Sequence, residues 1–353
     1  MRILRWSALG VVLAVVVLLS LFLVVGAPAP VPPGPPENAP RVVVGMGDST
    51  MSGEGAADYD PATNGKGGDW CHRSPHASIL QVKLPTAPQA INLACSGAPS
   101  GQVELGDTKQ YTEPSQAARL RDLATTHRVV AIVLAIGAND DPSFSHVLDD
   151  CIQSYLTPNR LGCAQTVGPV WQGRVDAMVP KVVRAIRDIR TAMAGAGYQN
   201  TDYQLVLQSY ASPVAVNVLE PLRNLSGCPL RREDLAWVHS KAVPVLTDGL
   251  RLAARQAGVR FLDLSQAGVG HEACSNTDQK KEWFRRLAVQ WTDLQSDQRA
   301  AHALQESFHP NAAGHAQIGR CEREFLDGVE PAASCRSGPD GDLHAAPVAA
   351  PGP

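Results

Sequence analysis

The sequence predicts a single α/β domain in which helices cover both faces of a mainly parallel sheet. Short apolar runs rich in β-branched residues, typical of buried parallel strands, recur along the chain. Segments with apolar residues at three- and four-residue spacing, typical of helices, separate them. Because strands alternate with helices along one chain, we expect a three-layer α/β/α arrangement.

Five segments fit the strand pattern and five fit the helix pattern. We expect strands at 41–47, 90–95, 128–137, 203–210 and 259–265. We expect helices at 76–84, 114–126, 172–196, 233–257 and 312–327. The stretch 278–305, rich in Lys, Arg, Trp and Gln, predicts one more amphipathic helix beside the last loop.

An apolar segment near the start of the chain predicts export across a membrane. Residues 6–25 carry no charge and follow Arg2 and Arg5. As a helix they would rise about 30 Å, the thickness of the hydrocarbon layer, and the arginines would keep their side in the cytoplasm. We therefore expect residues 1–26 to be a transmembrane anchor, or a signal sequence if a peptidase removes them.

Two segments of biased composition border the predicted domain. Residues 27–40 hold seven prolines in fourteen positions, which is typical of an extended linker. Residues 336–353 are rich in Pro, Gly and Ala without an apolar period, so we expect a disordered tail. Residues 41–335 remain as the folded domain, long enough to bury one core.

All eight cysteines follow the apolar segment and so lie on its exported side. An even number in an oxidising compartment predicts a disulfide framework. Spacing does not decide the pairing, and our working hypothesis joins nearest neighbours: Cys71–Cys95, Cys151–Cys163, Cys228–Cys274 and Cys321–Cys335. A zinc site at Cys71, His72 and His76 is the alternative, but no second pair at ligand spacing accompanies it.

The charge of the chain argues against a nucleic-acid partner. The formal net charge is −3, with both signs interspersed and no basic run after the apolar segment. We expect a monomer that needs no cofactor or metal. Its membrane contact would be through the N-terminal helix.

Residues suited to acyl transfer follow the predicted strands. They are Ser49 after the first strand, Gly97 after the second, Asn139 after the third, and Glu306 and His309 on a late loop. Ligands of parallel α/β sheets bind beyond the carboxyl ends of the strands. A hydroxyl, an imidazole, a carboxylate and amide donors are the groups that acyl transfer requires.

Each of these residues also has a structural explanation. A serine after Gly-Asp can cap a helix, an asparagine before aspartate can form a turn, and a histidine before proline can lie in an ordinary loop, as can His302 and His315. Gly45 and Gly47 imitate a dinucleotide-binding fingerprint, although Thr50 replaces its third glycine. The joint occurrence of all the catalytic types, in this order, favours chemistry.

Four short motifs resemble those of the SGNH (GDSL) hydrolase superfamily. GDST at 47–50 and GAND at 137–140 match its first and third blocks, and ACSGA at 94–98 and ESFHP at 306–310 resemble its second and fifth. GDSTMSGEGAADYDP and WCHRSPHA resemble the secreted actinobacterial esterase/lipase-like branch. The resemblance spans about residues 42–325 and implies a flavodoxin-like parallel sheet of about five strands.

This resemblance implies an extracytoplasmic serine esterase that forms an acyl-enzyme. Ser49 would be the nucleophile and His309 its base, while the N–H groups of Ser49 and Gly97 and the Asn139 amide would bind the oxyanion. The family usually has aspartate three residues before the histidine. This chain has Glu306 there, which would accept the Nδ1–H bond, although some relatives use a backbone carbonyl instead.

The expected substrate is an acyl or acetyl ester of a lipid or a carbohydrate. Two alternatives remain open from the sequence. One is an acyltransferase that uses the same serine and histidine on envelope glycans. The other is a non-catalytic module that binds the cell envelope and retains the fold.

Overall fold

The structure is a computed structural model that describes residues 14–15, 32, 34–290, 302 and 304–348. The chain divides into two units, residues 1–33 and 34–353, and the second contains the elements below. The predicted membrane or signal segment at 1–26 lies almost entirely outside the described residues, as do residues 27–31 and 33 of the linker. Within the described part of the chain, no helix has the length and apolar character needed to cross a bilayer.

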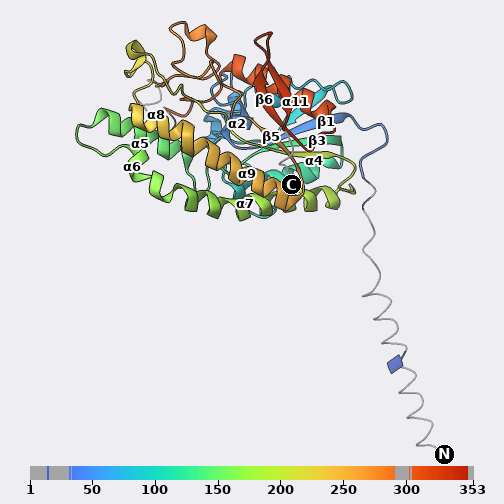
Figure 1. Ribbon diagram of the computed structural model, residues 1–353. Coiled ribbons are helices and arrows are strands. Elements are labelled where there is room, and N and C mark those ends of the chain that lie inside the picture. Colours follow the sequence, from blue (N-terminus) through green and yellow to red (C-terminus); the bar gives the residue numbers. More distant parts are fainter. Residues whose placement is uncertain (1–13, 16–31, 33, 291–301, 303, 349–353) are drawn as a thin grey trace, which may run out of the picture. The chain divides into compact units, whose positions relative to one another are not determined.

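A seven-stranded sheet in the order β2-β1-β3-β4-β5-β6-β7 forms the centre of the domain (Figure 1). Its strands are β1 (Arg41–Gly47), β2 (Gln89–Asn92), β3 (Arg128–Ala135), β4 (Gln204–Gln208), β5 (Arg260–Asp263), β6 (Ala332–Ser337) and β7 (Leu343–Pro347). All neighbouring pairs are parallel except β6 and β7. The predicted α/β class with a mainly parallel sheet is confirmed, and its five predicted strands are β1 to β5.

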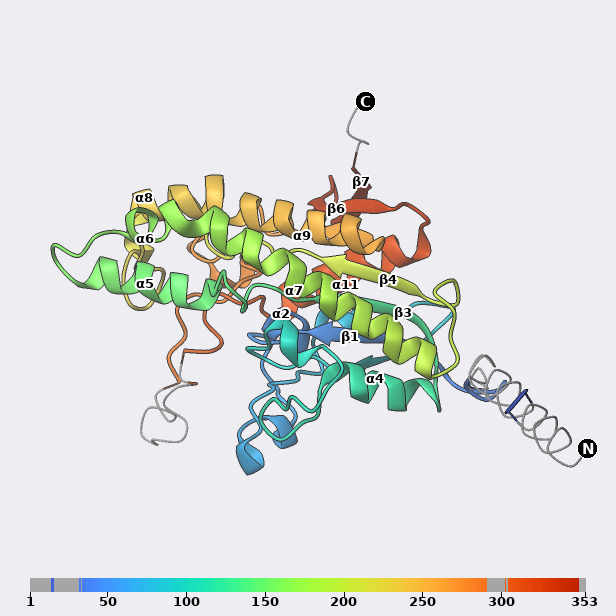
Figure 2. The ribbon, with the colours of Figure 1, turned by 90° about the horizontal axis from the view of Figure 1, so that it is seen from below.

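Helices cover both faces of this sheet. On one face, α7 (Gly168–Gly195) lies between α4 (Gln116–Ala124) and α9 (Val243–Ala257), as Figure 2 shows. On the other face, α3 (Ser78–Gln81) packs against α11 (Ala312–Asp327). The long helix α7 buries a stripe at three- and four-residue spacing, and this stripe includes Trp171, Val175, Met178, Val182, Ile186 and Ile189.

Several shorter elements complete the domain. They are α2 (Ser49–Ser52), α5 (Phe144–Leu156), α6 (Cys163–Thr166) and α8 (Arg232–Trp237), which continues into α9 through a π-helical turn at Val238–Ala242. Short 3₁₀ turns occur in the loops. The α5 helix lies at the carboxyl ends of the strands and has no counterpart in the sequence prediction.

The amphipathic helix predicted over 278–305 is absent from residues 278–290, where the structure has one 3₁₀ turn at Gln279–Lys281. Residues 283–285 are extended instead and pair with the loop of His309: the Arg285 N–H donates to the His309 carbonyl at 2.9 Å, and Phe284 and Pro310 form a β-bridge. Trp283 and Phe284 are buried by this pairing. Residues 291–301 and 303 lie outside the described part.

The prediction of a disordered tail from residue 336 is wrong for residues 336–347. Those residues form the end of β6 and the antiparallel strand β7, in which Ala345 pairs with Cys335. Leu343 is fully buried, and the Gln317 side chain on α11 accepts a hydrogen bond from its N–H at 2.9 Å. The strand has a weak pattern of its own and forms because β6 and α11 present partners for it.

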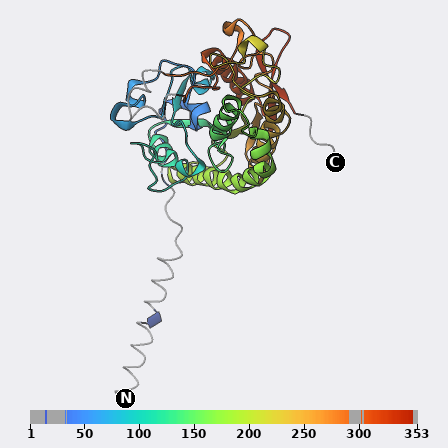
Figure 3. The same ribbon diagram turned by 90° about the vertical axis from the view of Figure 1, so that its left-hand side faces the viewer.

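Four disulfides join the predicted nearest neighbours: Cys71–Cys95, Cys151–Cys163, Cys228–Cys274 and Cys321–Cys335. The nearest-neighbour hypothesis is therefore confirmed. Near the carboxyl ends of the strands, which face the viewer in Figure 3, Cys71–Cys95 joins two loops and Cys151–Cys163 joins α5 to α6.

Candidate active site

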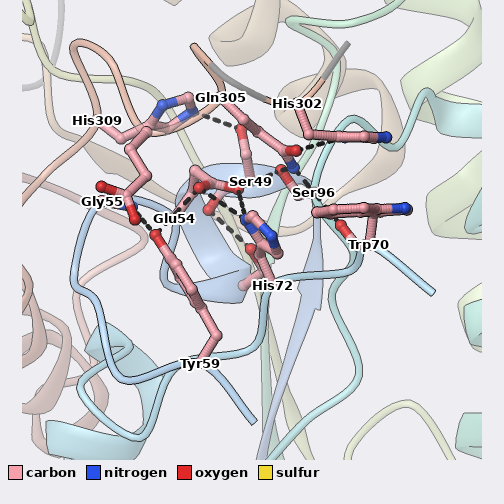
Figure 4. A network of polar contacts seen from close by, with 12 residues as sticks. Ser49, Glu54, Gly55, Tyr59, Trp70, His72, Ser96, His302, Gln305 and His309 are labelled. Carbon is pink, nitrogen blue, oxygen red and sulfur yellow. Dashed lines mark hydrogen bonds and ion pairs between the residues drawn. The ribbon is translucent and has the colours of Figure 1, made fainter. Parts of the chain in front are cut away.

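Ser49 and His309 meet at the carboxyl end of β1. That strand ends at Gly47, and Asp48 caps the short helix α2, in which Ser49 is the first residue. His309 comes from the loop before α11. Its Nε2 lies 2.8 Å from the Ser49 Oγ although 260 positions separate the two residues in the sequence (Figure 4).

A backbone carbonyl orients the His309 ring. Its Nδ1 lies 3.2 Å from the Ser307 carbonyl oxygen. Because a carbonyl can only accept, the proton of the neutral ring belongs on Nδ1, and Nε2 is left to accept the Ser49 hydroxyl proton. Burial lowers the pKa of His309 below its ordinary value, which keeps the ring neutral at pH 7.

The structure does not bring Glu306 to the Nδ1 atom of His309. The Glu306 carboxylate is buried, and one of its oxygens lies 3.8 Å from an Nη2 atom of Arg285. Its charge also raises the pKa of the nearby Tyr59 hydroxyl, after the larger effects of burial and of the Glu54 charge. The geometry therefore gives the place of the expected triad acid to the Ser307 carbonyl.

The three predicted oxyanion donors, Ser49, Gly97 and Asn139, line one cavity together with His309. Gly97 has a φ of 78°, a conformation that favours glycine, and lies exposed at the cavity wall. Among the hydrogen bonds of the described residues, none uses the backbone N–H of Ser49 or Gly97. The Asn139 amide donates to the Ala98 carbonyl at 3.2 Å, which turns it toward the Gly97 loop.

Asp48 is buried beneath the nucleophile and pairs with Tyr210, which is partly buried. The Tyr210 hydroxyl donates to Asp48 Oδ2 at 2.5 Å, and the Thr50 N–H donates to Oδ1 at 3.1 Å. Burial, only partly opposed by these bonds, raises the pKa of Asp48 to about 7. This pair fixes the start of α2 and therefore the position of Ser49.

A second polar cluster, centred on Glu54, lies below His309 (Figure 4). The fully buried carboxylate is 3.0 Å from His72 Nδ1 and accepts hydrogen bonds from Ser96 Oγ at 2.7 Å and Tyr59 at 3.1 Å. Gln305 donates to Ser96 Oγ at 2.6 Å. Sequence reasoning missed this cluster, although a glutamate in the glycine-rich stretch after Ser49 was a usable signal.

The cavity beside Ser49 has a volume of about 370 Å³ and a largely apolar wall. Helix α5 supplies part of the wall, and loops after β4 and β5 supply more of it. The apolar lining residues include Phe144, Leu148, Ile152, Ala211, Pro213, Leu264, Phe284, Leu287 and Phe308. Such a cavity suits an apolar chain next to a polar reacting group.

The alternative candidates have other partners. Cys71 is bonded to Cys95, His72 pairs with Glu54, and His76 lies 3.0 Å from Asp58, so the three do not converge as zinc ligands. His315 is fully buried: its Nδ1 accepts from the Ser78 N–H and its Nε2 donates to the Glu54 carbonyl. His302 stacks on Trp70 at the cavity.

Residues 46–317 match the model of the GDSL-like lipase/acylhydrolase family. The chain belongs to this family. Since the match covers most of the domain, the protein is a carboxylic ester hydrolase of the SGNH (GDSL) type. The resemblance seen in its four motifs is thereby confirmed.

Known proteins from Streptomyces are similar to this family member. It is 23% identical over 286 residues to Lipase 2 of Streptomyces coelicolor, which covers 80% of this chain and 85% of the relative. An extracellular lipase from Streptomyces rimosus superposes with a TM-score of 0.53 at 19% identity, covering 78% of this chain and 94% of that one. Phospholipase A1 from Streptomyces albidoflavus superposes with a TM-score of 0.54 at 22% identity, covering 79% of this chain and 95% of that one. These two structures share the fold.

Proposed function

We propose that this GDSL family member is an extracytoplasmic esterase that uses a Ser49–His309 dyad on esters with an acyl chain longer than acetyl. The observation that supports it most directly is the 2.8 Å contact between Ser49 Oγ and His309 Nε2 at the wall of an apolar cavity. A nucleophile in contact with its base, next to space for a chain, is the minimum arrangement for an esterase.

The proposed reaction begins when Ser49 Oγ bonds to the ester carbonyl carbon and its proton passes to His309 Nε2. The carbonyl oxygen becomes an oxyanion, which the N–H groups of Ser49 and Gly97 and the Asn139 amide stabilise. Collapse of this intermediate breaks the ester C–O bond, and His309 returns the proton to the departing alcohol. Water then attacks the acyl-enzyme by the same route, which releases the acid and restores Ser49.

The size and lining of the cavity favour a chain over an acetyl group. An acetyl group would leave most of the 370 Å³ cavity unfilled. Each methylene that leaves water for an apolar wall contributes about 0.8 kcal/mol. The cavity therefore favours lipid-like esters, in line with the similarity to Lipase 2 of S. coelicolor.

An extracytoplasmic location agrees with the four disulfides, because such bonds persist in oxidising compartments. The apolar segment at 6–25 agrees with export. The similar S. rimosus enzyme is described as extracellular. Anchoring through that segment stays a prediction.

The test is hydrolysis of p-nitrophenyl esters from acetyl to palmitoyl. We expect kcat/KM to rise at least about tenfold from acetyl to octanoyl, because added methylenes are buried in the cavity. Leu148→Trp on α5 should shift the preference toward shorter chains by filling the cavity. The matched control is Leu252→Trp on the exposed side of α9, which should leave the preference unchanged.

The dyad is tested separately. Ser49→Ala and His309→Ala should each lower kcat/KM by several orders of magnitude without unfolding the domain. Either variant retaining a tenth of the wild-type activity would contradict the dyad. A flat chain-length profile with an intact dyad would contradict only the proposed acyl preference.

A further inference from the structure

The dyad lacks an anion bonded to His309. Another group must therefore balance the positive charge that the ring acquires during the reaction. When the ring accepts the Ser49 proton it becomes an imidazolium inside a partly buried site. The group at Nδ1 is the neutral Ser307 carbonyl, which contributes a dipole and no charge. A nearby fixed negative charge would lower the energy of that imidazolium.

Glu54 is a buried anion with a complete set of partners. Burial alone would raise the pKa of its carboxyl, but the bonds from His72 and Ser96 hold the pKa below its ordinary value. His72 is in turn stacked on Tyr59, with ring centroids 4.3 Å apart. The carboxylate is therefore ionised and fixed in one orientation at neutral pH.

The backbone after Glu54 is packed directly on His309. A Cβ atom added to Gly55 would lie 2.9 Å from the His309 Cβ, and Gly55 has a φ of 82°. Arg285 joins the two segments, because its Nε donates to the Gly55 carbonyl at 2.7 Å and its N–H donates to the His309 carbonyl. No solvent layer fits between these backbones, so a charge on Glu54 acts through protein of low polarity.

Among the charged groups around His309, Glu54 has the largest effect in raising the pKa of the ring. Glu306 shares its charge with Arg285, 3.8 Å away. His315 has its pKa lowered by burial to about 4 and is neutral. His72 is the immediate counterpart of Glu54, and it lies on the far side of the carboxylate from the His309 ring in Figure 4.

We propose that Glu54 is a positioning residue that replaces the missing triad acid from a distance, stabilising the His309 imidazolium through its buried charge. This role rests on the proposed Ser49–His309 chemistry and adds no covalent step to it. The proton moves from Ser49 Oγ to His309 Nε2 and on to the leaving alcohol, and Glu54 remains ionised throughout. The Ser307 carbonyl fixes the tautomer, while Glu54 sets the basicity of the ring.

The experiment measures kcat/KM for p-nitrophenyl octanoate against pH in Glu54→Gln. Loss of the negative charge makes the imidazolium less stable, so the acidic limb of the profile should move to lower pH by about 0.5–1 unit. The plateau should fall by about three- to tenfold, because the transition state carries the same imidazolium. Glu322→Gln is the control for changing a buried carboxyl to an amide without loss of a charge, since Glu322 is equally buried on α11 and burial raises its pKa to about 8. Its limb should coincide with that of the wild type.

Two further variants keep the test decisive if Glu54→Gln does not fold. Glu54→Asp retains the charge and should keep the limb within about 0.3 unit of the wild type. Glu54→Gln with His72→Gln removes both members of the buried pair, which costs less stability than removing one. This double variant should show the same downward shift of the limb.

An unmoved limb in a folded Glu54→Gln or double variant would overturn the role, even if the plateau fell, because a purely structural loss lowers activity without changing the pKa of His309. Failure of the proposed function would look different: the wild type itself would then show no hydrolysis that depends on Ser49.

Discussion

At the scale of single residues, the orientation of His309 by a main-chain carbonyl changes the expected role of Glu306. A side chain that touches neither Nδ1 nor Nε2 of the base contributes through its charge and packing only. The pairing of Glu306 with Arg285 weakens even that charge. The acid position of the motif is thus occupied by an acid that does not perform the usual function.

We therefore predict that Glu306→Gln lowers kcat/KM less than about tenfold, equivalent to about 1.4 kcal/mol. If Glu306 were the triad acid, its change to an amide should cost at least about a hundredfold. Steady-state hydrolysis of p-nitrophenyl octanoate distinguishes the smaller loss from the larger one. A hundredfold loss in Glu306→Gln together with recovery in Glu306→Asp would restore Glu306 to the triad.

The residue scale also shows what the sequence could not reveal about the site. Ser49, Gly97, Asn139 and His309 belong to short motifs, and the structure gathers all four at one cavity. The contact between Tyr210 and Asp48 joins residues 162 positions apart and belongs to no motif. The contacts of Glu54 depend on how the loop after α2 folds back. Such pairings arise only when strands are in register, so a single sequence does not encode them locally.

At the scale of elements, the β6–β7 hairpin shows that a weak local pattern can still give ordered structure. The five residues of β7 include a proline and two alanines, which predict little strand formation by themselves. Their order comes from pairing with β6 and from α11, where Glu324 accepts a hydrogen bond from the Ala345 N–H at 3.0 Å. Long-range partners also hold α5, which the Cys151–Cys163 disulfide joins to α6 and in which Phe144 packs near Trp171 of α7.

We predict that Leu343→Ala lowers the free energy of unfolding by about 2–4 kcal/mol, because the side chain is fully buried at the start of β7. Denaturant unfolding under non-reducing conditions measures this change. Val348→Ala, just beyond the strand and 42% exposed, is the matched control and should change stability by less than about 0.5 kcal/mol. Equal stabilities for the two variants would mean that the tail does not pack on the domain.

At the scale of the whole molecule, the alternation of strands and helices was enough to predict the layers and the edge of the sheet that holds the site. Runs such as Val42–Val44 are fully buried on both faces of β1, as parallel strands between helix layers must be. The number of strands was less predictable, because β6 and β7 follow α11 in a segment of mixed composition. Buried ionisable groups inside this frame give the molecule a pH-dependent stability that the net charge does not reveal.

Glu322 on α11 is the group from which we predict that dependence. Its carboxyl is fully buried, Ser78 Oγ donates to it at 2.9 Å, and burial raises its pKa to about 8. Between the ordinary value near 4.5 and 8, the folded protein retains a proton that the unfolded chain has released. Unfolding therefore releases a proton, and stability falls as the pH rises through this window, by at most about 1.4 kcal/mol per unit.

Glu322→Gln should remove this slope, because the amide resembles the neutral carboxyl and does not titrate. The free energy of unfolding, measured in denaturant at pH 5, 6, 7 and 8, should decline less steeply in the variant. The difference in the free energy of unfolding between the variant and the wild type should therefore shift in favour of the variant toward pH 8. Asp48, with a pKa of about 7, adds a similar slope to both proteins, so only their difference reports on Glu322. Glu233→Gln, at an exposed position on α8, is the control and should follow the wild type. A constant difference between Glu322→Gln and wild type across this range would show that Glu322 is ionised in the folded protein.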